Sequence, residues 1–306
     1  MRIISIGTLN FLLLIILLAS TNFSLWSQIR SGFVTAENCK ISYTVFGKGE
    51  PILIINGGPG MNSAGFEGLA ARLGEEYQAI IFDQRGTGKS GLSSINSNTV
   101  NMDLMIEDIE LLRKHLKIDS WTILGHSFGG ILANLYAAEY PENIEALIHS
   151  SSAGIDMNFL PPGGIRASLT ETEIDSLDYW SEIDQTDPSE KSAYMYRFYL
   201  AKAYLHSDKN VSTIAARLGQ ANRTINSLIW RELRETGYDL STELKDFEQP
   251  VLIMQGESDI LHPDTAIKMK ETFKNSKLVL LEKCGHYGWI ENPGKYFKNI
   301  DLLMKN

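Results

Sequence analysis

The chain has 306 residues, of which 43% are hydrophobic and 21% are charged, and its formal net charge at pH 7 is −9. This composition is typical of a globular protein that is long enough to bury a core without disulfides or metals. The acidic balance argues against the basic face that nucleic-acid binders usually present, so we expect no nucleic-acid partner.

The first 27 residues have the pattern of a targeting segment. Arg2 supplies a short positive region, an apolar run extends from Phe11 to Ala19, and small residues suited to cleavage follow in 20–27. This pattern is typical of a secretory signal peptide, and the apolar run is short for a membrane span. We expect a secreted or periplasmic protein, or a membrane-anchored one if the segment is not cleaved.

From residue 40 onward, short apolar runs alternate with amphipathic stretches. Continuous apolar strands separated by helices are typical of a parallel α/β sheet. The predicted strands are 41–46 (as an edge strand), 51–56, 77–83, 121–125, 144–149, 250–254 and 278–281. The predicted helices are 101–116, 128–140, 265–273 and 296–304.

The strand pattern lapses over residues 155–246, which contain turn residues at 161–164 and helical spacing around 194–205. We therefore expect one α/β core, formed by 28–154 and 247–306, that is interrupted by a helical cap at 155–246. The cap contains 15 acidic and 10 basic residues, a net charge of −5.

The segment Gly125-His126-Ser127-Phe128-Gly129 fits the pattern G-x-S-x-G between a predicted strand and a predicted helix. In such a nucleophile elbow, a sharp turn lifts the serine hydroxyl clear of the sheet, and the glycines let the two backbones approach closely. This context predicts Ser127 as the nucleophile of a serine hydrolase.

A serine hydroxyl needs a general base, and His286 is the best placed of the six histidines. It lies in a loop after the last predicted strand, and parallel sheets place their chemistry at the carboxyl ends of strands. Asp259 follows the preceding strand in the same way and would orient the imidazole, with Glu257 and Asp264 as weaker candidates. The order serine, aspartate, histidine is that of an α/β-hydrolase triad.

Backbone N–H groups must also stabilise the oxyanion of an acyl-transfer reaction. The glycine-rich segment 56–60 directly follows a predicted strand, so its backbone can approach the substrate closely. We assign the N–H groups of Gly58 and Phe128 to the oxyanion hole.

The segment 83–90, Asp-Gln-Arg-Gly-Thr-Gly-Lys-Ser, resembles a phosphate-binding loop but has Asp83 where that motif needs glycine. No helix is predicted directly after Ser90, so no helix N-terminus would face a phosphate. We expect no nucleotide partner.

The chain resembles the α/β-hydrolase superfamily and, within it, the proline iminopeptidase branch. The segments that carry the resemblance are Gly-Gly-Pro-Gly, Asp-Gln-Arg-Gly-x-Gly-x-Ser, the elbow, Gly-x-x-Asp and Gly-His. The resemblance extends from about residue 40 to the C-terminus. It implies a mainly parallel eight-stranded sheet flanked by helices, a helical cap between strands six and seven, and an acyl-enzyme mechanism with no metal or other cofactor.

Two segments differ from that branch. Asn56 stands where the branch usually has histidine, and the elbow Gly-His-Ser-Phe-Gly is the one found in many esterases and C–C hydrolases. The leading hypothesis is an aminopeptidase that releases N-terminal residues from short peptides. The alternatives are an esterase, a lactonase or a C–C-bond hydrolase acting on a small molecule, or a hydrolase fold used only for binding.

The resemblance also bears on the cap and on the cysteines. In the iminopeptidases, cap carboxylates hold the free amine of the substrate, which makes Glu232, near Trp230, the candidate for amine capture here. The strand order of the family separates Cys39 from Cys284, so both are expected to be free thiols. Neither belongs to a pattern that binds a metal.

Overall fold

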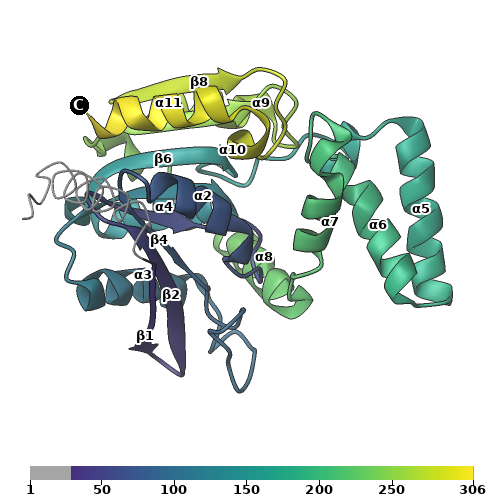
Figure 1. Cartoon of the computed structure of the whole chain (residues 1–306), viewed down its shortest axis with the longest axis horizontal. Coiled ribbons are helices and arrows are strands. Elements are labelled where there is room, and N and C mark those ends of the chain that lie inside the picture. The colour runs from purple at the N-terminus through teal and green to yellow at the C-terminus, as the bar shows by residue number, and fades with distance from the viewer. Residues whose placement is uncertain (1–28, 306) are drawn as a thin grey trace, which may run out of the picture.

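The computed structural model describes residues 29–305, so the predicted signal peptide at 1–27 lies outside the described residues. One sheet of eight strands has the order β1-β2-β4-β3-β5-β6-β7-β8. Its first three strands pair antiparallel, and the other neighbours pair parallel. The mainly parallel eight-stranded sheet that the sequence predicts is therefore confirmed (Figure 1).

The predicted strands are confirmed to within a few residues, with two corrections at one edge. The strand predicted as an edge, 41–46, is second in the sheet, and the edge strand β1 was not predicted. Only one of the seven residues of β1 is buried, so its sequence lacks an apolar signal. The strands are β1 (Arg30–Ala36), β2 (Cys39–Gly47), β3 (Pro51–Ile55), β4 (Gln78–Phe82), β5 (Trp121–Ser127), β6 (Ile144–Ser152), β7 (Val251–Gly256) and β8 (Ser276–Leu281).

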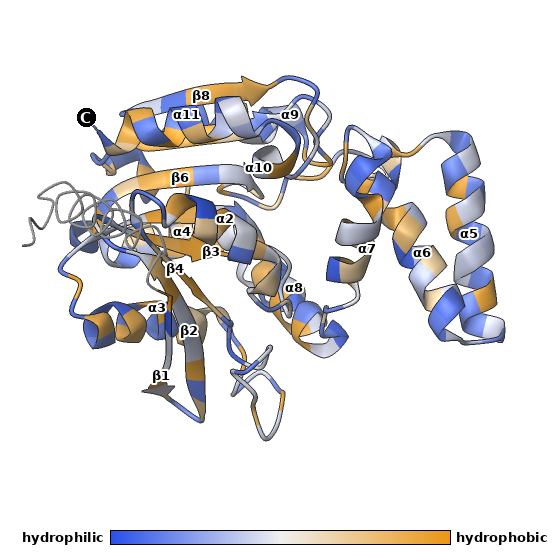
Figure 2. Cartoon of the chain, in the orientation of Figure 1, coloured by the Kyte–Doolittle hydropathy of each residue, from blue (hydrophilic) through white to orange (hydrophobic). Residues whose placement is uncertain are grey.

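Helices cover both faces of the sheet, and successive side chains along a strand pack against opposite faces. In β3, Leu53 and Ile55 pack toward α3, α4 and α9, whereas Ile52 and Ile54 pack toward α2 and α11. The orange strands between the helices in Figure 2 reflect this two-sided burial. These helices are α2 (Glu67–Leu73), α3 (Met102–Leu116), α4 (Phe128–Glu139), α9 (Pro263–Thr272) and α11 (Pro293–Met304), and only α2 lacks a predicted counterpart.

The cap lies between β6 and β7 and is helical. Figure 1 shows α5 and α6 side by side, projecting away from the sheet. Leu177 is the one buried residue of α5, which is mostly blue and white in Figure 2. The cap helices are α5 (Glu171–Thr186), α6 (Glu190–Lys202), α7 (Val211–Leu218) and α8 (Arg223–Thr236).

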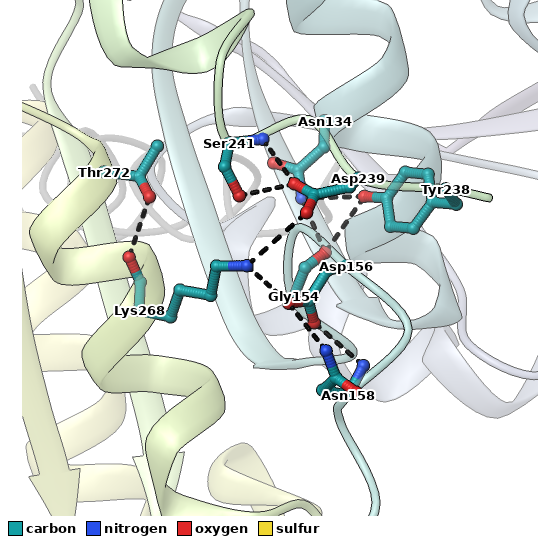
Figure 3. A network of polar contacts seen from close by, with 9 residues as sticks. All are labelled: Asn134, Gly154, Asp156, Asn158, Tyr238, Asp239, Ser241, Lys268 and Thr272. Atoms are coloured by element: carbon teal, nitrogen blue, oxygen red, sulfur yellow. Dashed lines mark hydrogen bonds and ion pairs between the residues drawn. The ribbon is translucent and has the colours of Figure 1, made fainter.

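A polar network joins the two ends of the cap to the core (Figure 3). The entering and leaving chains meet in an antiparallel bridge between Asp156 and Asp239, and Lys268 of α9 forms ion pairs with both carboxylates. The Tyr238 hydroxyl and the Asn134 amide donate to the Gly154 carbonyl at 3.0 and 2.8 Å. These contacts fix where the cap leaves the sheet, next to the end of β6.

The two cysteines are free thiols, as predicted. Cys39 lies in β2, and Cys284 follows β8 at the other end of the strand order. Within residues 29–305, no helix has the length and apolar content needed to cross a bilayer.

We expect His149 to make the stability of the fold sensitive to acid. It is fully buried in β6, and neither ring nitrogen has a hydrogen-bond partner among the described residues. Burial lowers the pKa of His149 from its usual 6.5 to about 4. Because the unfolded chain takes up this proton at higher pH than the folded chain does, the free energy of unfolding should fall as the pH drops from 6.5 to 4.

Replacing His149 with leucine should make the fall in the free energy of unfolding between pH 6.5 and 4 smaller by about 3 kcal/mol. This is the free-energy equivalent of the pKa shift of His149. Urea unfolding of both proteins at pH 8, 6.5, 5 and 4 measures the difference. At pH 8 both side chains are neutral, and the leucine protein should be at least as stable. Equal pH slopes in the two proteins would contradict the assignment.

Candidate active site

Ser127 lies on a sharp turn between β5 and α4. Its backbone has φ 54° and ψ −122°, a conformation that residues with a Cβ atom rarely adopt. Strain of this kind costs about 1–3 kcal/mol and is concentrated at functional sites. The flanking glycines allow the turn, because a Cβ atom on Gly125 would lie 2.6 Å from the carbonyl oxygen of Gly129. The turn has the form predicted for a nucleophile elbow.

His286 and Asp259 lie beside each other in loops that follow β8 and β7. His286 Nδ1 is 2.7 Å from Asp259 Oδ1, and the two side chains are 2% and 1% exposed. Asp259 Oδ1 also accepts a hydrogen bond from the Leu261 N–H at 3.3 Å. His286 and Ser127 line the same cavity, so the fold brings the three predicted triad residues together.

The weaker carboxylate candidates lie elsewhere. Glu257 is exposed, and the Asp264 N–H donates to His262 Nδ1 at 3.2 Å. His126 contacts the Ser150 carbonyl through its Nδ1 at 2.9 Å, and its ring centroid is 4.6 Å from that of His286. Burial and the nearby charges of His286 and Arg217 lower the pKa of His126 well below its usual range, so this ring stays neutral beside the triad.

The loop 56–60 follows β3 and borders the cavity through Gly57, Gly58 and Pro59. Gly58 has φ 76°, which a residue with a Cβ atom would adopt only under strain. Phe128 is the first residue of α4, and the first N–H groups of a helix have no partner within it. Both residues assigned to the oxyanion hole therefore lie on the cavity wall next to Ser127.

Asn56 is the first residue of this loop and stands where the proline iminopeptidase branch usually has histidine. Its amide donates to the carbonyl oxygens of Gly57 and Met61 at 3.2 and 3.0 Å. The cap contributes three further hydrogen bonds, from Arg217 Nη2 to Gly57 O (3.2 Å), Asn226 Nδ2 to Pro59 O (3.2 Å) and Asn222 N to Gly60 O (2.9 Å). The cap thus positions the loop as well as covering it.

The cavity between core and cap has a volume of about 510 Å³, which suits a small molecule or the end of a peptide. Most of its wall is apolar. The side chains that line it include Met61, Phe128, Met157, Phe159, Leu160, Ile165, Leu218, Trp230, Ile260 and Leu261, with Tyr204, Tyr287, Asn226, Arg217 and Arg234 as polar groups. Sequence reasoning missed the cap residues Arg217, Asn226 and Arg234.

One face of α8 borders the cavity, and Glu232 is not on it. Asn226, Trp230 and Arg234 are spaced by four residues, so they share a face, and all three line the cavity. Glu232 is two residues from Trp230 and is rotated by about 200° from it. Its carboxylate accepts from the Met102 N–H at 3.1 and 3.2 Å, at the start of α3. The structure does not bring the predicted amine-binding residue to the cavity.

The segment 83–90 is a turn held by its own side chains. Asp83 accepts hydrogen bonds from the Ser63 and Lys89 N–H groups, and Arg85 forms a buried ion pair with Asp108 at 2.7 Å. The next helix, α3, starts twelve residues after Ser90. Among residues 29–305, no cluster of three or more His, Cys, Asp or Glu residues could hold a metal ion.

A substitution at Gly129 tests whether α4 must lie as close to β3 as the structure places it. A Cβ atom there would lie 2.1 Å from the carbonyl oxygen of Ile55 and 2.9 Å from that of Asn56. We expect Gly129→Ala to lower the free energy of unfolding by about 3 kcal/mol, because backbone atoms must move apart. Gly68→Ala in α2, where a Cβ atom would meet nothing within 4 Å, is the matched control and should be neutral or stabilising. Urea unfolding checks both, and an unchanged Gly129→Ala midpoint would contradict the contact.

A family model described as alpha/beta hydrolase fold matches residues 50–293 of the chain. The chain is 27% identical to the proline iminopeptidase of Heyndrickxia coagulans over 289 residues, which cover 90% of this chain and 98% of that one. It is 28% identical to the proline iminopeptidase of Clostridioides difficile (strain 630) over 294 residues, which cover 89% and 96%.

Solved structures share the fold at lower identity. The esterase EaEST from Exiguobacterium antarcticum has a TM-score of 0.71 at 24% identity and covers 90% of this chain and 100% of its own. The 2-hydroxy-6-oxo-6-phenylhexa-2,4-dienoate hydrolase from Rhodococcus sp. strain RHA1 has a TM-score of 0.73 at 20% identity and covers 92% and 100%.

Proposed function

The chain belongs to the α/β-hydrolase family, and on that premise we propose that it is a serine hydrolase that acts through an acyl-enzyme. The observation that supports this most is the 2.7 Å contact between His286 Nδ1 and Asp259 Oδ1, with His286 and Ser127 on the wall of one cavity. The carboxylate would hold the imidazole with its Nε2 free to accept a proton and would stabilise the imidazolium that forms.

In the proposed reaction, Ser127 Oγ attacks the substrate carbonyl carbon while His286 takes the serine proton. The Gly58 and Phe128 N–H groups stabilise the oxyanion, and the N-terminus of α4 favours the developing negative charge. His286 then protonates the leaving group, and the acyl group stays on Ser127. Water attacks this acyl-enzyme with His286 as base, and the free acid leaves.

A fluorophosphonate probe tests this proposal on the intact protein. We expect one probe molecule on Ser127, located by mass mapping of peptides, because the probe reacts only with an activated serine. Folded protein that is not labelled, or that is labelled at another serine, would reject the assignment and would favour a hydrolase fold used for binding.

Two kinds of scissile bond are candidates. The curated relatives favour the release of N-terminal residues, such as proline, from short peptides. The largely apolar cavity and the Gly-His-Ser-Phe-Gly elbow favour an ester, lactone or C–C bond. Turnover of proline 2-naphthylamide compared with p-nitrophenyl butyrate separates them, because an aminopeptidase needs the free amine and an esterase does not.

We further propose that the protein is exported, on the basis of the N-terminal sequence alone. N-terminal sequencing of the protein recovered from the periplasm or medium should find a start near residue 28. An intact Met1 in a membrane fraction would instead support the anchored alternative.

A further inference from the structure

The charged groups on the cavity wall are both cations. Arg217 of α7 and Arg234 of α8 line the cavity, and no aspartate or glutamate lies among its lining residues. The carboxylate closest to the chemistry, Asp259, lies behind His286 and is engaged by it. The neighbouring groove, lined by α5, α6 and the segment that joins α7 to α8, holds Asp184, which accepts from the Ser192 hydroxyl, together with Arg197 and Arg223.

Arg217 is a buried cation without a carboxylate partner. Its guanidinium is 4.6 Å from the centre of the Phe66 ring, and one nitrogen donates to the Gly57 carbonyl. Its Nη1 has no hydrogen-bond partner among residues 29–305 and lies against Gly65, where a Cβ atom would come within 2.2 Å of it. The Tyr287 side chain interacts with the guanidinium but carries no charge to neutralise it. Burying a charge without a counterion is costly, so an anion in the adjoining cavity would stabilise this arrangement.

Arg234 stands at the exposed end of the face of α8 that borders the cavity. It is one helical turn beyond Trp230, whose ring contacts Phe128 and Phe159 at 5.7 and 5.4 Å between centroids. No ion pair or hydrogen bond of its side chain occurs within the described part of the chain. A guanidinium with all five donors free can bind a carboxylate through two parallel hydrogen bonds.

We propose that the substrate bears a carboxylate at the far end of its acyl chain from the scissile bond, and that Arg234 binds it within the positive field of Arg217. This inference rests on the proposed serine-hydrolase function and names its substrate class. The apolar wall between Ser127 and Arg234, which includes Phe128 and Trp230, would hold the chain that joins the two ends. A substrate with a free ammonium group would meet two cations and no carboxylate.

Three p-nitrophenyl esters with one leaving group test the charge preference. They are the monoester of adipic acid (anionic), its methyl ester (neutral) and the 6-aminohexanoate ester (cationic). We expect the wild-type kcat/KM to be about 10- to 100-fold higher for the anionic than for the neutral ester, the size of one charge-assisted contact, and lowest for the cationic ester. The preference should weaken with added salt.

Variants at Arg234 show whether the preference depends on this side chain. Arg234→Met should lower kcat/KM for the anionic ester by about 10- to 100-fold, mainly through KM, and leave the neutral ester within about twofold. Arg234→Lys should restore part of the preference, and Arg234→Glu should shift it toward the cationic ester. Arg231→Met, at an exposed position of α8 off the cavity wall, is the matched control and should change none of the ratios.

A binding measurement keeps this proposal separate from the proposed function. In the Ser127→Ala protein, monomethyl adipate should raise Tm and dimethyl adipate should not, and Arg234→Met should abolish the effect. If no ester is cleaved but this shift is seen, the proposed function fails and the anion site stands. If the neutral or cationic ester is preferred, or Arg234→Met changes all three esters equally, the anion site is rejected.

Discussion

Replacing Ser127 with alanine is expected to lower kcat/KM for a p-nitrophenyl ester by about 10⁴-fold or more. The hydroxyl is the only group lost, and in the proposed mechanism it is the nucleophile from which His286 takes the proton. The residual rate would come from binding and from the oxyanion N–H groups, which remain.

The same variant should fold normally. Alanine keeps the Cβ atom, so the strained φ of 54° at position 127 is unchanged, and Tm should stay within about 2 °C of the wild type. Ser120→Ala, directly before the first residue of β5, is the matched control and should keep full activity. Near-native turnover by a folded Ser127→Ala protein would refute the nucleophile assignment.

Replacing Asp259 with asparagine is expected to lower kcat by about 10³- to 10⁴-fold, with a smaller change in KM. The amide is nearly the same size as the carboxylate, but it removes the charge 2.7 Å from His286 Nδ1. It can also turn its NH₂ group toward that nitrogen, which would favour the imidazole tautomer that cannot accept the serine proton.

Asp264→Asn is the control for this change, because Asp264 is an exposed carboxylate in the neighbouring segment that lies off the cavity wall. It should keep the wild-type kcat. Steady-state kinetics on one ester, with circular dichroism to confirm folding, measure both variants. If Asp259→Asn lowers kcat by less than about tenfold, the carboxylate that orients His286 must be another residue.

Much of the core could be predicted because its strands are buried on both faces. The apolar runs that became β3, β4 and β5 are continuous, and the carboxyl ends of the neighbouring strands β3 and β5 bring Gly58 and Ser127 together. In contrast, β1 pairs with β2 through its backbone while most of its side chains are exposed. A strand that is stabilised in this way leaves no periodic signal in the sequence.

The cap was harder to predict for a related reason. Its helix α5 buries only Leu177, because its other apolar residues, such as Ile174, Trp180 and Ile183, are half-buried. The contacts that give the cap its role are single polar groups, such as the Arg217 and Asn226 side chains on the carbonyls of the loop 56–60. A hydrogen bond between positions 160 residues apart has no local pattern.

The sequence by itself determined the α/β-hydrolase fold class and singled out Ser127, Asp259 and His286, because each of them follows a recognisable strand. It also determined that the cap has a net charge of −5. Only the tertiary structure decided which of those charges face the cavity. The rotation of α8 about its axis turns Arg234 toward the cavity and Glu232 toward α3. A cap that is acidic overall therefore presents arginines to the cavity.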